Sequence, residues 1–119
     1  MGTNAEAWEF AEKWIAAWNA HDLEVILTHY AENVRLTSPA AAKLLQLPSG
    51  TIERKEKLRG YFKRGLEAYP NLKFDLLDVL SEVSSVVIYF KNQIGTRTAE
   101  FMEFGEDGKV ARVVANYGA

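Results

Sequence analysis

The chain has 119 residues, the size of one domain, and its 48% hydrophobic and 25% charged residues are typical of a globular protein rather than a disordered one. The formal net charge of -2, without a basic stripe, argues against a nucleic-acid partner. The apolar runs are far shorter than a membrane span, so we expect no membrane partner either. The sequence therefore predicts a single domain over residues 1–119.

Cysteine is absent, which excludes disulfides, thiolate nucleophiles and thiolate metal ligands. His21 and His29 stand eight residues apart without helper ligands, and no glycine-rich phosphate loop occurs, so we expect neither a metal nor a cofactor. Residues 1–7 lack the pattern of a signal peptide, and a cytoplasmic location is expected.

The first part of the chain is predicted to be a pair of helices followed by a strand. Apolar residues recur at steps of three and four over residues 8–18, the period of a helix face. Asp22 can cap a second, short helix that runs to Tyr30. Alternating apolar and polar residues over 33–38 predict a half-buried strand, which Pro39 ends.

The middle of the chain contains an apolar connection and then the clearest helix. Residues 40–50 are rich in Ala and Leu, and we expect them to fold over a site as a flap. Residues 55–69 carry one apolar stripe with basic residues beside it, and Pro70 follows.

The C-terminal half is predicted to be all strand, because it is rich in β-branched and aromatic residues. A turn at Gly95 and a hairpin signal at residues 106–108 separate its strands. The expected strands are 74–83, 85–92, 96–104 and 110–117. Helices first and antiparallel strands last predict an α+β fold with the helices on one face of the sheet.

Both faces of the last hairpin carry apolar groups. By strand alternation, Glu100, Met102 and Phe104 point one way, toward the helices. The other face is expected to carry Phe101, Val110 and Val114, which are poorly suited to water. We therefore expect a homodimer through the outer face of the sheet.

Three segments carry a family resemblance: residues 14–39 (WIAAWNAHDL through YAENVRLTSP), residues 50–62 (GTI, then KEKLRGYF) and residues 100–110 (EFMEF, then DGKV). In this order, and over nearly the whole chain, they resemble the nuclear transport factor 2-like superfamily, in its SnoaL-like, ketosteroid-isomerase-like branch. The resemblance implies a cone-shaped, strongly curved antiparallel sheet whose concave face is covered by three N-terminal helices. The superfamily includes isomerases, cyclases, hydrolases, dehydratases and non-catalytic binding domains, so the resemblance specifies the fold rather than the reaction.

Glu100 is the candidate catalytic residue. A carboxyl group that faces an apolar cavity loses hydration, which raises its pKa and lets it serve as an acid or a base near neutral pH. By resemblance, its position matches the oxyanion-binding acid of ketosteroid isomerases. The alternative is a structural carboxylate that Arg97, a tyrosine or an asparagine satisfies.

The rest of the isomerase pattern is broken. Ser38 stands where the resemblance places the general-base Asp, and Trp14 stands where it places the oxyanion-binding Tyr. Ala115 lies near the position of the Asp that cyclase and epoxide-hydrolase relatives use. The usual steroid isomerisation is therefore not expected, and Ser38 and Tyr117 are candidates for orienting donors.

An aromatic-rich set of residues is predicted to face the helices, and part of it is expected to line a pocket for a small hydrophobic molecule. The alternative is that the whole set forms an ordinary core. The set comprises Trp14, Trp18, Tyr30, Tyr61, Phe62, Phe74, Met102, Phe104, Val113 and Ala115.

Three functions are compatible with these residues. The first is an isomerase or lyase that uses Glu100 on a small hydrophobic substrate. The second is a non-catalytic pocket that binds an apolar ligand. The third is an interaction domain whose cone is filled with side chains.

Overall fold

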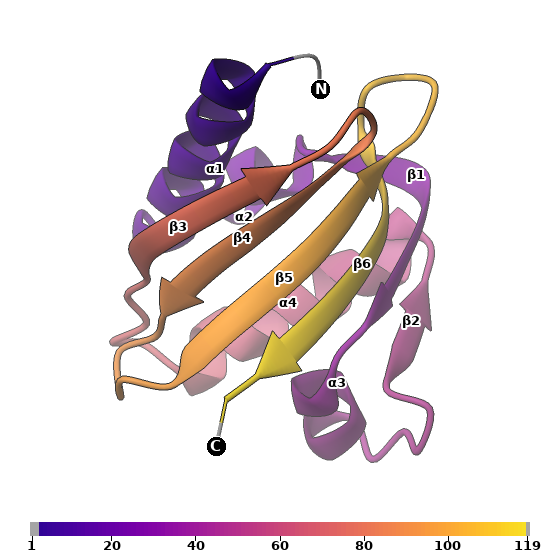
Figure 1. Ribbon diagram of the computed structural model, residues 1–119. Coiled ribbons are helices and arrows are strands. Elements are labelled where there is room, and N and C mark those ends of the chain that lie inside the picture. The colour runs from indigo at the N-terminus through magenta and orange to yellow at the C-terminus, as the bar shows by residue number, and fades with distance from the viewer. Residues whose placement is uncertain (1–2, 119) are drawn as a thin grey trace.

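The structure is a computed structural model that describes residues 3–118, and it is an α+β fold (Figure 1). Four helices and six strands follow one another along these residues. In chain order they are α1 (Asn4–Asn19), α2 (Leu23–Leu27), β1 (Tyr30–Thr37), α3 (Pro39–Leu44), β2 (Thr51–Glu53), α4 (Lys55–Ala68), β3 (Asp75–Ser81), β4 (Ser85–Lys91), β5 (Arg97–Phe104) and β6 (Val110–Tyr117). No helix of the described residues is long and apolar enough to span a bilayer.

Side-chain caps begin the first two helices. The Thr3 hydroxyl accepts a hydrogen bond from the Glu6 amide at 3.1 Å, and the Asp22 carboxylate accepts one from the Val25 amide at 3.2 Å. Each bond satisfies an amide that has no partner within its helix. The predicted role of Asp22 as a cap is therefore confirmed.

The six strands form one sheet in the order β2-β1-β6-β5-β4-β3. Every neighbouring pair is antiparallel except β1 and β6, which run parallel, so the sheet is mostly antiparallel, in agreement with the predicted fold. The parallel pair arises because α3, β2, α4 and β3–β5 separate the two strands in sequence, and a parallel pair needs such a long crossover.

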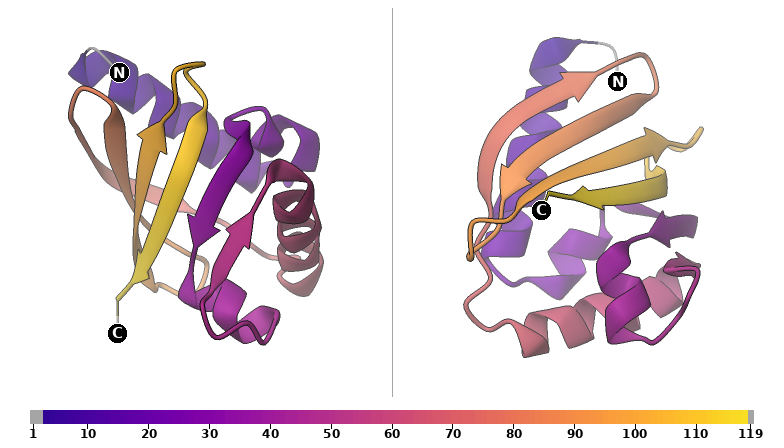
Figure 2. Two further views of the ribbon diagram at one scale, coloured as in Figure 1. Left: turned by 90° about the vertical axis from the view of Figure 1, so that its right-hand side faces the viewer. Right: turned by 60° about the horizontal axis from the view of Figure 1, so that its bottom comes forward.

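The sheet curves, and helices α1, α2 and α4 lie on its concave side, as the sequence predicts (Figure 2). Irregular pairing adds to the curvature: Glu103 pairs with Arg112 but Phe104 pairs with Val110, which leaves Ala111 as a bulge in β6. The bulge turns Val110 inward, where it is 0% exposed. The prediction that Val110 lies on the outer face is therefore wrong, because simple alternation does not hold across a bulge.

The fourth helix, α3, lies in the apolar connection that the sequence predicts as a flap. The Ser38 hydroxyl caps it by accepting a hydrogen bond from the Ala40 amide at 3.1 Å. The Ser38 amide in turn donates to the Gly50 carbonyl at 2.9 Å, which ties the two ends of the connection together. A Cβ atom on Gly50 would lie 2.7 Å from the Ser38 carbonyl oxygen, and its φ is +63°, so this closure requires glycine.

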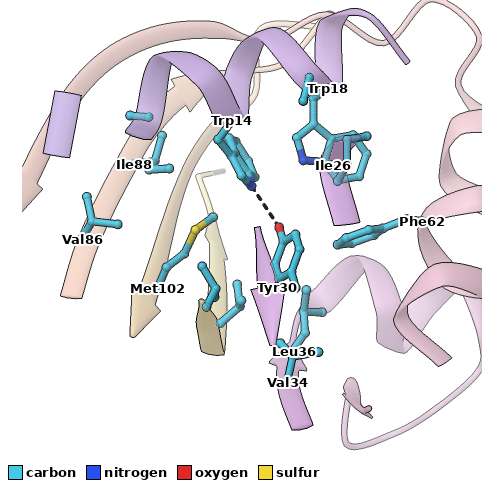
Figure 3. Packing of buried hydrophobic residues seen from close by; sticks show 14 of the residues in the cluster. Trp14, Trp18, Ile26, Tyr30, Val34, Leu36, Phe62, Val86, Ile88 and Met102 are labelled. Carbon is cyan, nitrogen blue, oxygen red and sulfur yellow. Dashed lines mark hydrogen bonds between the residues drawn. The ribbon is translucent and has the colours of Figure 1, made fainter. Parts of the chain in front are cut away.

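The core fills the space between the concave face and the helices (Figure 3). At its centre, the Trp14 indole nitrogen donates a hydrogen bond to the Tyr30 hydroxyl at 2.9 Å. Trp14 also stacks on Phe74, with ring centroids 5.9 Å apart, and Met102 and Val113 are fully buried in the same core. Packing on all sides makes these residues part of the fold's stability.

Candidate functional site

A cavity of about 620 Å³ opens at one end of the molecule, between the sheet, α3 and α4. Its size lies within the range of pockets that bind small molecules. Its wall includes eight of the predicted site residues, which come from α1, the junction between β1 and α3, α4, the α4–β3 connection, β5 and β6. They are Trp18, Ser38, Tyr61, Phe62, Phe74, Glu100, Ala115 and Tyr117.

Five residues of the predicted pocket do not line the cavity. Trp14, Tyr30, Met102 and Val113 are buried in the core. Phe104 lies near the opposite end of β5, where it meets Phe10 edge to face at 5.1 Å between ring centroids. These five predictions are wrong because an inward direction on a strand does not distinguish the filled part of a concave sheet from its open end.

Glu100 lies in the middle of β5, where it pairs with Ile88 on one side and Ala115 on the other. Among residues 3–118, no side chain or backbone group hydrogen-bonds or ion-pairs with its carboxyl group. Burial raises the pKa of Glu100 to about 8, because the ionised form loses hydration without gaining a partner. The Arg97 guanidinium, a predicted partner, instead donates to the Tyr89 hydroxyl at 3.5 Å.

Two hydroxyl groups meet in the wall of the same cavity. Ser38 Oγ and Tyr117 Oη lie 3.2 Å apart, at the ends of the neighbouring strands β1 and β6. Burial raises the pKa of Tyr117, and the negative charge of Glu100 raises it further. The same two influences, burial first, raise the pKa of Tyr30 in the adjoining core. All these phenols therefore stay protonated at neutral pH and are available as hydrogen-bond donors.

Tyr61 of α4 supplies another hydroxyl group to the wall. Burial is the main cause that raises its pKa, and the charges of Tyr117 and Glu100 add to the effect. The influence of Glu100 on Tyr117, and of both residues on Tyr61, indicates that the three side chains lie close together. The cavity thus brings the Glu100 carboxyl group together with the hydroxyl groups of Ser38, Tyr61 and Tyr117.

Further polar atoms in the cavity-lining residues have no hydrogen-bond partner in the described part of the chain. They are the Trp18 indole nitrogen, the Thr98 hydroxyl and the Gln93 side-chain oxygen. The Trp18 nitrogen lies near the Tyr30 hydroxyl, but the geometry does not reach that of a hydrogen bond. An unsatisfied buried polar atom costs about 1–3 kcal/mol, so these three groups lower the stability of the protein by leaving their hydrogen-bonding capacity unused.

Sequence reasoning missed much of the wall. Thr98 could have been found, because it lies two residues before Glu100 and therefore shares its face of the strand. Leu36 of β1 and Phe90 of β4 lie in strands too, whereas most of the others come from α3, α4 and the α4–β3 and β4–β5 connections, where no two-residue period indicates a direction. The wall residues that were not predicted are Leu36, Pro39, Ala40, Lys43, Leu44, Gly65, Tyr69, Leu72, Phe90, Asn92, Gln93, Ile94, Thr96 and Thr98. Within residues 3–118, no group of three or more His, Asp or Glu side chains is arranged to hold a metal ion.

The fold has many solved relatives. A SnoaL-like protein of unknown function from Burkholderia thailandensis is 37% identical over 98% of both chains, with a TM-score of 0.94. A proposed isomerase of the SnoaL-like family from Agrobacterium tumefaciens is 16% identical, covering 97% of this chain and 99% of that one, with a TM-score of 0.77. A proposed ketosteroid isomerase from Kribbella flavida is 19% identical, covering 92% and 75%, with a TM-score of 0.73.

The last two similarities concern the fold alone, because their sequence identities are low. No protein of curated function matches the chain significantly. The profile described as SnoaL-like domain matches residues 11–113, which is most of the chain. With the curved sheet, the helices on its concave face and the close Burkholderia relative, this match shows that the chain belongs to the SnoaL-like domain family.

Proposed function

We propose that the cavity binds a small hydrophobic carbonyl compound and that Glu100 acts on it as the acid–base group of an isomerase or lyase. The observation that carries the proposal is the unpaired Glu100 carboxyl group in an apolar wall. The family includes neighbours described as a proposed isomerase and a proposed polyketide cyclase, which fits proton-transfer chemistry. A volume of about 620 Å³ argues against a cone filled with side chains.

The raised pKa gives Glu100 two complementary roles. With a pKa of about 8, most of the carboxyl groups are protonated at neutral pH and can donate a hydrogen bond to a carbonyl oxygen. The ionised fraction can take a proton from the carbon next to the carbonyl and return it elsewhere. Tyr117 and Tyr61 supply further donors that would orient the oxygen.

The serine at position 38 limits the chemistry. Its hydroxyl accepts the Ala40 amide and contacts Tyr117, so it positions groups but cannot take a proton from carbon. A reaction in this cavity therefore depends on one carboxyl group, not on two. We expect simple proton shifts or eliminations rather than the steroid isomerisation of relatives that carry an Asp there.

Deuterium exchange tests this role directly. In D₂O, the protein is expected to accelerate exchange at the carbon next to the carbonyl of 2-tetralone, an apolar bicyclic ketone. Glu100→Gln should lower this acceleration about a hundredfold, because the amide cannot exchange protons with carbon. Glu103→Gln is the matched control, since Glu103 lies three residues along the same strand and is exposed. Equal exchange with wild type and Glu100→Gln would refute a catalytic Glu100.

A non-catalytic ligand pocket is the second candidate, and the lack of a basic partner at Ser38 favours it. In that case 2-tetralone binds, as line broadening in its NMR spectrum would show, without faster exchange. Glu100→Gln then changes the affinity only modestly.

We also propose a homodimer through the outer face of the sheet, and a cytoplasmic location. The dimer is supported by an apolar row that crosses four strands, in which Leu80 pairs with Val87, Val87 with Phe101, and Phe101 with Val114. Such a row is costly to leave in water. Cell fractionation with an antibody against the chain tests the location.

A further inference from the structure

The mouth of the cavity lies at one end of the molecule. The wall residues from α3, the end of α4, the β4–β5 turn and the end of β6 gather there. These segments form the lower end in Figure 1, and the right-hand view of Figure 2 looks toward them. We define the mouth end as residues 37–45, 61–75, 90–98 and 115–118.

The mouth end is basic although the chain as a whole is acidic. It carries six basic side chains and two acidic ones, for a formal charge of +4. The basic residues are Lys43, Lys63, Arg64, Lys73, Lys91 and Arg97, and the acidic ones are Glu67 and Asp75. Because the net charge of the chain is -2, the rest carries -6. The field at the mouth therefore attracts anions while the remainder of the surface repels them.

The basic residues of the mouth end also lack ion-pair partners. The ion pairs among the described residues involve Lys13, Arg35, Lys55 and Arg59, and all four lie outside the mouth end. Lys43 is the one basic residue that the structure places in the cavity wall itself, on the exposed side of α3. A cation beside the opening is thus available to a bound molecule.

Beside these charges, the rim of the mouth is apolar. Ile94 is 78% exposed and Tyr69 is 52% exposed, and both line the cavity. Moving inward, the wall continues through Leu72, Phe74 and Phe90 to Glu100. The wall between solvent and Glu100, its one acidic group, therefore offers these apolar side chains to a bound molecule, with Lys43 at its exposed side.

We propose that the ligand of this cavity is an anionic amphiphile, namely an apolar body with a carboxylate or similar group at one end, which enters body first and leaves its anion at Lys43. The inference rests on the proposed function and adds the substrate class to it. The opposite orientation would place the anion in the apolar wall beside Glu100, where the loss of hydration opposes it. At the rim the anion stays hydrated and gains the attraction of the basic residues.

A matched pair of fluorescent probes tests the inference. The pair is 11-(dansylamino)undecanoate and its primary amide, which share the apolar body and differ in charge. Wild type is expected to bind the carboxylate about three- to tenfold more tightly than the amide. Lys43→Met should remove most of this preference, because the carboxylate probe loses its nearest cation whereas the uncharged amide does not. Lys57→Met is the control, because Lys57 is an exposed lysine of α4 outside the mouth end, and it should keep the preference.

The salt dependence of binding is a second readout. Raising the ionic strength from about 0.02 M to about 0.5 M should lower the affinity for the carboxylate probe and leave the affinity for the amide probe unchanged. Equal affinities of the two probes for wild type, or a preference that survives Lys43→Met undiminished, would overturn the inference and leave the proposed function standing. Failure of both probes to bind would count against the cavity function itself, and this inference would fall with it.

Discussion

Ser38 and Tyr117, 79 residues apart in the sequence, share a hydrogen bond of 3.2 Å in the wall of the cavity that also holds Glu100. The bond forms because β1 and β6 run parallel and end together at the mouth, with Thr37 beside Val114. It places two donors next to a carboxyl group that has no partner of its own. The chemistry of the site therefore depends on how Glu100 responds to pH.

The stability of the protein should fall as the pH rises from about 5 to about 8 because of Glu100. Burial raises the pKa of Glu100 from its ordinary 4.5 to about 8, so over this range the native state keeps a proton that the unfolded chain has lost. The free energy of unfolding then decreases with pH, by on the order of a few kcal/mol. Urea unfolding at several pH values measures it.

Glu100→Gln should flatten this dependence and leave the variant more stable than wild type above about pH 8. The exposed Glu103→Gln should keep the slope of wild type. An unchanged slope in Glu100→Gln would mean that Glu100 is hydrated in the native state.

A bulky side chain at Gly65 should block the cavity without harming the fold. Gly65 lies in α4 and lines the cavity, and a Cβ atom there meets nothing within 4 Å. Gly65→Trp should lower the affinity for the dansyl probe about tenfold, as expected when a ligand loses its space. Fluorescence titration measures the effect.

Gly60 provides the matched control for this substitution. It lies in the same helix, its Cβ direction is equally open, and it does not line the cavity. Gly60→Trp should leave probe binding intact, while both variants gain up to about 0.5 kcal/mol from replacing a helical glycine. If the two variants bind equally well, the probe occupies another site.

Arg54 should be a source of strain whose removal stabilises the protein. It precedes α4 with φ +81° and ψ 139°, a region that residues other than glycine rarely adopt. Arg54→Gly is expected to raise the free energy of unfolding by about 1 kcal/mol. Arg64→Gly, in the interior of the same helix, should lower it by about 1 kcal/mol. Thermal denaturation of both variants shows whether each substitution raises or lowers the free energy of unfolding. Destabilisation by Arg54→Gly would contradict the assignment of strain.

Tyr30 should be needed for stability rather than for binding. Tyr30→Phe removes the acceptor of the Trp14 indole and leaves a buried donor unpaired, which costs about 1–3 kcal/mol. Tyr89→Phe, which loses only a long contact with Arg97 at 3.5 Å, should cost less than about 0.5 kcal/mol. A loss of probe affinity in a folded Tyr30→Phe protein would show that the cavity extends into the core.

A charge in the centre of the apolar row should dissociate the proposed dimer. Phe101 stands between Val87 and Val114 on the outer face of the sheet. Phe101→Glu is expected to shift the sedimentation coefficient from that of a dimer to that of a monomer, because burying unpaired carboxylates opposes association. The outer-face residue Asn116, replaced by Ser, serves as the control. A monomeric wild type at micromolar concentration would exclude the dimer.

Local patterns were enough to predict most of the architecture. The 3.6-residue and two-residue periods depend on neighbouring residues alone, so α1, α4 and the four C-terminal strands could be placed from the sequence. The family resemblance supplied the curved sheet and the helices on its concave side. The short α3 and β2 were missed because a few residues carry no readable period.

The candidate site likewise has a part that local patterns predict and a part that only the folded chain determines. The sequence was enough to predict that Glu100 points toward the concave face of the sheet, because the alternation of side chains along β5 is regular at that point. Only the tertiary structure decides that Trp14, Tyr30, Met102 and Val113 are packed into the core while Trp18, Phe62 and Phe74 border open space, because this depends on how far the helices reach along the curved sheet. The bulge at Ala111 and the gathering of basic residues at the mouth are likewise set by chain segments that meet only after folding.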